Sequence, residues 1–201
     1  HLDVLKIRKT LEKASEGISG VDILEIERDS HLIFRDGMTT SEIQKTLKQT
    51  VNDKIKVESP NYTYLGARLE LQDLVKEAGK YSKYKSLKEV IDKGVSQNIY
   101  IQDLKYKYDL DILDKFIDTS RDTLLTYYGV ITFKDRYAKY NLDDTLLEMP
   151  QHFFMRVAMA VAIIEESKGF LDDTLITKVR ELNPVLSDDT IYKHCWAITF
   201  Y

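Results

Sequence analysis

One apolar run constrains this chain more than any other feature. Residues 153–164, FFMRVAMAVAII, contain a single polar side chain, that of Arg156. A helix that is apolar around its whole circumference is a buried helix rather than a surface one. Twelve residues rise only about 18 Å, which is too short to cross a bilayer, and Pro150 suits the first turn. The run therefore predicts a buried core helix in which Arg156 meets a carboxylate or several carbonyl groups.

The composition favours a mostly helical protein with one or two domains. The 201 residues are 43% hydrophobic and 31% charged, and they include only 8 Gly and 3 Pro. A net charge of −4 indicates neither a nucleic-acid nor a membrane partner. We find no signal-peptide pattern and no transmembrane run, which favours a cytoplasmic location. The single cysteine, Cys195, cannot form an internal disulfide, and no motif for a metal site is present.

Helical periodicity predicts four short helices in residues 1–78, which would form a small bundle. We expect them to begin at Asp3, Val21, Thr40 or Thr39, and Pro60, with Glu42 supporting the third start. Gly17 and Gly20 end the first helix, and the second reaches about Phe34. The expected buried faces are Val4, Ile7 and Leu11; Ile23, Ile26, Ser30 and Ile33; Ile43, Leu47, Val51 and Ile55; and Tyr64, Leu65, Leu69, Leu71 and Leu74.

Residues 79–85 are polar and predict a domain boundary, and the chain from there to residue 201 is again helical. We expect a helix from Ser86 to about Lys93 closed by Gly94, an irregular stretch from 100 to 108, and a helix over 110–117 that begins at Asp109 or Asp111. An amphipathic helix over 171–182 and a last helix capped by residues 187–189 complete the prediction.

Two groups of side chains could have a catalytic role, but we favour a structural interpretation of each. Asp118, Arg121 and Asp122 could form an acid–base cluster, but their spacing favours local ion pairs and a buried arginine network. Four tyrosines near them are predicted to be core and interface aromatics rather than radical carriers, namely Tyr127, Tyr128, Tyr137 and Tyr140.

The stretch MPQHFFMRVAMAVA resembles the (E)xPQxxFMRVAxGxA segment of the large, catalytic subunit of class I and II ribonucleotide reductases. The stretch FIDTSRDTLLTYYGVITFKDRY is similar to the same family's IDxxRDxxFxYxGLxTLxxRY segment. LDVLKI, DGMTTSEI and PNYTYLGARLEL resemble pieces of an ATP-cone, a domain that reads the ATP to dATP ratio. The resemblance implies a mainly all-α chain, with an ATP-cone at 1–78 and, at 79–201, the helical domain that precedes the ten-stranded α/β barrel.

The resemblance also implies which residues bind ATP or dATP. Lys6 and Ile7 would lie beside the nucleotide, with Lys6 toward the phosphates, and Thr40 would donate to a phosphate at a helix N-terminus. Gln44 matches a position that faces the nucleotide, and Lys76 matches a basic residue that reaches the phosphates. The alternatives are solvated surface charges for the lysines and a plain helix cap for Thr40. A complete cone opens with a β-hairpin that covers the nucleotide, and we expect that this hairpin has been trimmed.

For the whole enzyme, the resemblance implies radical-based reduction of ribonucleotides, with this region as its allosteric and structural part. The cysteine thiyl site and the dithiol pair would lie downstream of Tyr201, so no residue here is assigned to catalysis. Cys195 would be a packed residue beside Trp196. The implied partners are a radical-generating small subunit that holds the metal, further large subunits in a homodimer or higher oligomer, the rest of the barrel, and thioredoxin or glutaredoxin. A naturally split reductase subunit and a stand-alone nucleotide-binding regulator without catalysis remain as alternatives.

Overall fold

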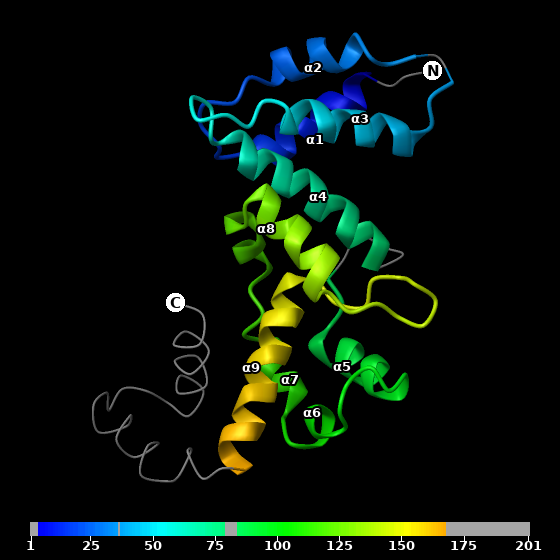
Figure 1. The fold of residues 1–201 in the computed structure, drawn as a ribbon, viewed down its shortest axis with the longest axis vertical. Helices are drawn as coiled ribbons and strands as arrows, with labels where there is room; N and C mark the ends of the chain where they lie inside the picture. The colour runs from blue at the N-terminus through cyan, green and yellow to red at the C-terminus, as the bar shows by residue number, and fades with distance from the viewer. Residues whose placement is uncertain (1–3, 36, 79–83, 168–201) are drawn as a thin grey trace, which may run out of the picture. The chain divides into compact units, whose positions relative to one another are not determined.

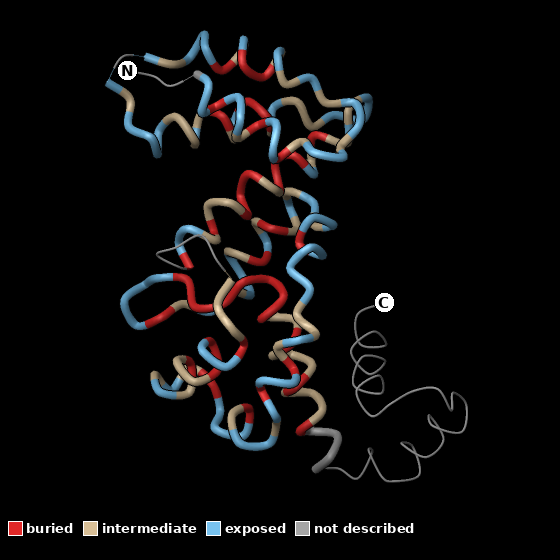
Figure 2. Tube along the Cα trace, turned by 180° about the vertical axis from the view of Figure 1, so that it is seen from behind, coloured by how far each residue is buried: buried red, intermediate tan, exposed pale blue. Residues whose placement is uncertain are grey.

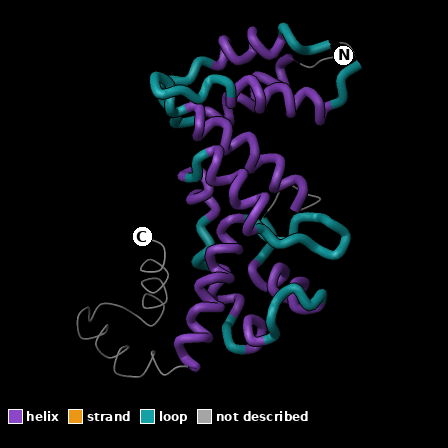
Figure 3. Tube along the Cα trace, viewed as in Figure 1, coloured by secondary structure: helices purple, strands orange, loops and turns teal. Residues whose placement is uncertain are grey.

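The computed structural model of the chain describes residues 4–35, 37–78 and 84–167, and these are mainly helical (Figure 1). Within these ranges there is no β-strand, and the isolated β-bridges join Lys56 to Ser59 and Tyr140 to Leu146 (Figure 3). The prediction of a mainly all-α chain is confirmed. By internal packing the chain divides into two compact units, His1–Ser82 with Ser120–Tyr137, and Lys83–Thr119 with Ala138–Tyr201.

The first unit is built on helices α1 (Val4–Ser15), α2 (Ile23–His31), α3 (Thr40–Asn52), α4 (Tyr62–Ala78) and α8 (Tyr127–Thr132), with the 3₁₀ turn η1 (Thr119–Leu124) at the boundary and the π-helical turn η2 (Phe133–Tyr137). Its core contains the predicted residues Leu11, Ile26, Leu47, Val51 and Leu65, which are 3% exposed or less. The apolar positions therefore face one another as the helical spacing predicts.

Local signals explain where these helices start and stop. The side chain of Asp22 caps α2 by accepting from the backbone N–H of Glu25 at 3.0 Å. Gly17 and Gly20 have φ angles of +72° and +73°, a region that glycine enters without strain, and they follow the end of α1 as predicted. The predicted cap Asp3 lies outside the described residues.

Two predicted helices in this unit are longer than the real ones. The helix expected over 21–34 covers only Ile23–His31, and Ile33, expected to be buried, is 53% exposed. The chain tightens into a turn there, because the N–H groups of Ile33 and Phe34 both bond to the carbonyl of Ser30. The helix expected from Pro60 begins at Tyr62, because Pro60 and Asn61 form the preceding turn, and Tyr64 is 37% exposed.

The second unit contains α5 (Leu87–Ser96), α6 (Asp103–Tyr106), α7 (Leu110–Asp114) and α9 (Pro150–Ser167). Ser86 caps α5 in a capping box with Glu89, and Asp109 caps α7, so both predicted starts are confirmed. The prediction that Gly94 closes α5 is wrong, because the helix continues to Ser96. The stretch expected to be irregular contains the short helix α6, and the helix expected to reach 117 ends at Asp114.

Gly94 has a packing role that its place inside α5 explains. A Cβ atom at this position would collide with the ring of Tyr100, which lies against the helix backbone. The carbonyl of Gly94 also accepts the N–H of Tyr100 at 3.1 Å, which turns the chain back onto the helix. The glycine is therefore required for close approach of an aromatic ring rather than for a helix end.

Helix α9 begins at Pro150, as predicted, but it is buried along one side rather than all round (Figure 2). Met155, Met159 and Ile163 are 8% exposed or less and pack with apolar residues of α5, α6 and α7. Phe153 and Val157 are half-buried. The prediction of a fully buried helix is wrong for the described residues, because the elements of this unit cover only one side of it.

The segment from 118 to 140 differs in part from its prediction. Asp122 is buried, at 5% exposed, but Arg121 is exposed, so the expected buried arginine network does not include it. Tyr128 and Tyr137 are 70% and 51% exposed, so they are surface residues of this chain. The helices expected over 171–182 and up to residue 201, and the packing of Cys195 beside Trp196, lie outside the described residues.

Candidate functional site

The predicted nucleotide site is centred on the start of α3, where two threonines have separate roles. Thr39 is the cap: its hydroxyl oxygen accepts from the N–H of Glu42 at 3.2 Å, and its N–H donates to the Glu42 carboxylate at 2.7 Å. These hydrogen bonds from Thr39 lower the pKa of Glu42. Thr40 is the first residue of the helix and is exposed. The side chain of Thr40 is thus available to a ligand without loss of the cap.

The structure brings Gln44 and Lys76 into contact. The ammonium group of Lys76, near the end of α4, donates to the side-chain oxygen of Gln44 at 3.2 Å and to the carboxylate of Asp73 at 3.1 Å. Gln44 lies one turn after Thr40, and Lys76 is 51% exposed. Two of the predicted site residues, Gln44 and Lys76, therefore lie in contact on one side of the helix pair, and the Lys76 side chain is half-exposed there.

A second lysine, Lys48, also joins α3 to α4. Lys48 of α3 donates to Glu70 and lies 3.0 Å from a carboxylate oxygen of Asp73, both on α4. Burial lowers the pKa of Lys48, but the hydrogen bonds with Asp73 and Glu70 more than offset this, so its pKa is raised. The charges on this side of the helix pair therefore alternate from Glu70 through Lys48 and Asp73 to Lys76.

The other two predicted residues lie on α1. Lys6 is exposed, and the side chain of Ile7 is 9% exposed and belongs to the apolar core of the first unit. Ile7 can thus support a bound group only indirectly, through its packing in the core. The position of both residues beside a nucleotide stays a prediction.

Arginine contacts hold α1 in place, and sequence reasoning missed them. Arg8 donates two hydrogen bonds to the carboxylate of Glu27 on α2, at 2.8 and 2.7 Å, and these lower the pKa of Glu27. Arg68 of α4 donates to the carbonyl groups of Ala14 and Glu16 at the end of α1, at 3.0 and 2.6 Å. The partners are separated by 19 to 54 positions, so no local spacing could have revealed them.

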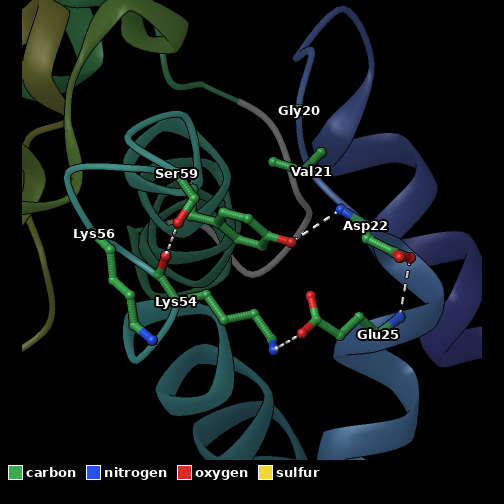
Figure 4. Close-up of a pocket in the computed structure, with 8 residues that line it drawn as sticks. Gly20, Val21, Asp22, Glu25, Lys54, Lys56 and Ser59 are labelled. Atoms are coloured by element: carbon green, nitrogen blue, oxygen red, sulfur yellow. Dashed lines mark hydrogen bonds and ion pairs between the residues drawn. The ribbon is translucent and has the colours of Figure 1, made fainter.

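The first unit also has a surface pocket of about 470 Å³ that contains none of the predicted site residues. The hydroxyl oxygen of Tyr62 accepts the backbone N–H of Asp22 at 2.9 Å. Figure 4 shows the side chains of Lys54 and Glu25 pointing toward one another in this pocket. Lys54 forms ion pairs with Glu25 at 3.1 Å and with Asp29 at 2.6 Å. The lining is Gly20, Val21, Asp22, Glu25, Lys54, Lys56, Ser59 and Tyr62. Two acidic and two basic side chains line it, so the pocket has no strong preference for an anion or a cation.

In the second unit, the buried charge predicted at Arg156 has a partner. Its guanidinium donates two hydrogen bonds of 2.8 Å to Glu148, which is fully buried. Glu148 also accepts from the hydroxyl of Tyr100 at 2.8 Å and from the N–H of Lys139 at 3.0 Å. Of the two kinds of partner predicted for Arg156, a carboxylate or several carbonyl groups, the structure contains the carboxylate. All of these contacts are internal, which makes the cluster structural.

His152, two residues into α9, is buried in its neutral form. Its Nδ1 accepts from the N–H of Met149 at 3.2 Å and its Nε2 is 2.9 Å from the carbonyl oxygen of Lys85, an arrangement that requires the proton on Nε2. Burial lowers the pKa of His152 from its ordinary value of 6.5 to about 4. With both ring nitrogens engaged, this histidine acts as a packed connector rather than a ligand or base.

The described ranges contain neither a metal-binding cluster nor a membrane-spanning helix. No group of three or more His, Cys, Asp or Glu residues there is arranged to hold a metal ion. No helix in the described part of the chain combines the length and the apolarity needed to cross a membrane.

Comparison with known proteins points to a single family. The family model described as "Ribonucleotide reductase, all-alpha domain" matches residues 123–201. The ribonucleoside-diphosphate reductase subunit alpha of Helicobacter pylori (strain ATCC 700392 / 26695) is 37% identical over 165 residues, which is 82% of this chain and 21% of that protein.

More distant relatives have the same name. The ribonucleoside-diphosphate reductase 1 subunit alpha of Escherichia coli (strain K12) is 28% identical over 199 residues, covering 93% of this chain and 26% of the relative. The subunit alpha of Enterobacteria phage T4 is 34% identical over 165 residues, covering 79% of this chain and 22% of the relative. The chain thus spans about a fifth to a quarter of the length of these relatives.

Proposed function

Because the chain belongs to the ribonucleotide reductase large-subunit family, whose N-terminal part it matches, we propose that it senses ATP and dATP for a ribonucleoside-diphosphate reductase. In this proposal residues 1–78 act as an ATP-cone. Residues 79–201 act as the helical support of the catalytic barrel.

The observation that carries the proposal is the contact between Lys76 and Gln44 beside the start of α3. A half-exposed ammonium group, an amide and the exposed Thr40 at a helix N-terminus suit a nucleotide polyphosphate, because the cation and the helix dipole both favour negative charge. Lys76 and Thr40 would bind the phosphates, and Gln44 would face the rest of the nucleotide. Lys6 and Ile7 of α1 would complete the site.

Sensing requires more than binding. ATP and dATP must favour different states of the large subunit, since a ligand with equal affinity for two states shifts neither. We propose that ATP favours the active state and dATP an inhibited oligomer. The bound nucleotide would act on the packing of α1, α3 and α4, which share one core.

The name of the relatives, ribonucleoside-diphosphate reductase subunit alpha, supports extending the proposal to the whole enzyme. The full subunit would reduce ribonucleoside diphosphates to deoxyribonucleotides in the cytoplasm, with its catalytic cysteines outside this chain. It would act with a metal-containing, radical-generating small subunit and with thioredoxin or glutaredoxin as reductant. Homodimers or higher oligomers of the large subunit would be its working forms.

Isothermal titration calorimetry of the full chain with ATP and with dATP tests the nucleotide site. We expect Lys76→Met to weaken ATP binding about tenfold or more, because charge-assisted hydrogen bonds contribute about 1.5–3 kcal/mol. Gln44→Ala should weaken binding by a smaller factor. Lys56→Met is the matched control, because Lys56 is an exposed lysine of the same unit in the separate pocket. An absence of binding heat with both nucleotides, or equal losses for Lys76→Met and Lys56→Met, would refute the site.

A further inference from the structure

Asp73 stands between the two lysines that join α3 and α4. One of its carboxylate oxygens is 3.0 Å from the ammonium of Lys48, and the other accepts from Lys76 at 3.1 Å. Its side chain is 29% exposed, compared with 10% for Glu70. Asp73 is therefore the carboxylate of this cluster that a ligand at Lys76 would meet.

The pairing has a consequence for any anion at this site. The charge of Lys76 is already partly neutralised by Asp73, and its position is fixed by Asp73 and Gln44. A phosphate group that approaches Lys76 must compete with the Asp73 carboxylate for the same ammonium. It also meets the negative charge of Asp73 within a few ångströms, where screening by salt is incomplete.

We propose that Asp73 sets the affinity of this site for the phosphates of the nucleotide, by holding Lys76 in the empty site and releasing it when nucleotide binds. The inference rests on the proposed function and adds the residue that tunes it. Asp73 does not itself bind the phosphate. It competes with the phosphate, so the site binds nucleotide less tightly than its lysine alone would allow.

The substitution Asp73→Asn tests the inference without removing the link between the helices. Asparagine has the same shape, and Lys48 retains its hydrogen bond to Glu70 at 3.0 Å, so the α3–α4 pair stays joined. Asp29→Asn is the matched control. Asp29 pairs with Lys54 at 2.6 Å, and Lys54 keeps its second partner Glu25. Lys54 follows the far end of α3, about 20 Å along the helix from Thr40, well beyond the screening length.

Calorimetric titration of the full chain with ATP, tripolyphosphate and adenosine measures the effect. We expect Asp73→Asn to bind ATP and tripolyphosphate about three- to tenfold more tightly than the unsubstituted chain, the range of a half-exposed charge interaction. Adenosine carries no phosphate, so its affinity should not change. Asp29→Asn should leave all three affinities within about twofold. In a Lys76→Met background most of the gain from Asp73→Asn should disappear, because the released cation is absent.

The other outcomes separate this inference from the proposed function. If the unsubstituted chain binds ATP and Asp73→Asn binds it equally or less well, Asp73 does not compete for Lys76 and only the inference fails. An equal gain for Asp29→Asn would assign the effect to net charge and would also overturn the inference. If neither the unsubstituted chain nor Asp73→Asn binds ATP or tripolyphosphate, both the inference and the proposed function fail.

Discussion

Arg156 and Glu148 form an ion pair with two hydrogen bonds of 2.8 Å each. Arg156 lies in the second turn of α9, and Glu148 lies two positions before that helix begins. Glu148 is fully buried and the Arg156 side chain is 15% exposed. The pair also holds Tyr100, whose hydroxyl donates to the same carboxylate and whose ring centroid is 5.2 Å from the guanidinium carbon. The segment before α9 and the chain after α5 are thus tied to one buried charge pair.

Removing one partner of this pair should be costly. We expect Arg156→Met to lower the free energy of unfolding by about 3–5 kcal/mol, because it leaves the Glu148 carboxylate buried without its cation. Urea denaturation followed by circular dichroism gives the value. The double variant Glu148→Gln/Arg156→Met should lose clearly less than the sum of the two single variants.

Arg28→Met is the control for this prediction. Arg28 is 70% exposed and pairs with Asp29 at 3.2 Å, so its loss should cost under about 0.5–1 kcal/mol. A similar loss for Arg28→Met and Arg156→Met would contradict the structural role given to the buried pair.

Gly94→Ala should destabilise the second unit although alanine is the better helix former. The added methyl group would collide with the Tyr100 ring, and that ring is held at its far end by Glu148. We expect a loss of about 1–3 kcal/mol from overpacking, against a gain of up to about 1 kcal/mol from helix propensity.

Thermal unfolding of the two variants Gly94→Ala and Gly129→Ala, measured in parallel, checks the predicted loss of stability. Gly129 lies in α8, and a Cβ atom there would come no closer than 3.3 Å to Thr126 Oγ1. This contact is tight but far less severe than the collision at Gly94, so Gly129→Ala should lower the melting temperature less than Gly94→Ala does. Equal effects at the two glycines would show that the Tyr100 contact is unimportant.

The stability of the chain should depend on the protonation of His152. Its pKa is lowered from 6.5 to about 4 in the folded state, so the unfolded state takes up the proton first as the pH falls. The contribution of the neutral, hydrogen-bonded ring is complete above pH 6.5 and is lost as the pH falls from there toward 4. The full difference is about 3 kcal/mol at 1.36 kcal/mol per pKa unit.

Urea unfolding of the wild-type chain and of His152→Gln is measured at a series of pH values. The difference between the two chains separates the effect of His152 from that of the carboxylates, which titrate below pH 5. The wild-type chain should lose its advantage over His152→Gln between pH 6.5 and 4. A stability difference that stays constant over this interval would mean that His152 titrates alike in the folded and unfolded chain.

Thr39 and Thr40 should separate capping from binding. Thr39→Ala removes the hydroxyl that caps α3 and should cost about 1 kcal/mol of stability. Thr40→Ala leaves the cap intact and should change stability by less than about 0.5 kcal/mol, because Thr40 is exposed.

If the proposed site is correct, Thr40→Ala should still weaken ATP binding several-fold in calorimetric titration, by loss of a hydroxyl that donates to a phosphate. The reverse pattern, in which Thr40→Ala destabilises the chain without changing ATP affinity, would make Thr40 a structural residue only.

Much of the fold could be predicted because its signals are local. The caps at Thr39, Ser86 and Asp109 were readable, since a cap depends on residues within three positions of it. Helix ends were predicted less well. The end of α2 and the continuation of α5 past Gly94 depend on turns and on a ring packed from outside the helix, and neither leaves a periodic pattern.

The candidate site was predictable only in part. The sequence predicts both Lys76 and Gln44 through a family resemblance and not through their spacing. The part of Asp73 in that contact was missed, because a carboxylate three positions before a lysine on an exposed helix face is common and carries no signal of its own.

The sequence by itself determined that the chain is helical, where most of its helices begin, and that the cation in the apolar run of α9 must meet a carboxylate or several carbonyl groups. Only the tertiary structure decided that the partner is Glu148, that Arg8 pairs with Glu27, and that Asp73 bridges Lys48 and Lys76. Capping and periodic burial act within one or two turns, so neighbouring residues encode them. The choice of a charge partner depends on distances between helices, which are set only when their apolar faces pack together.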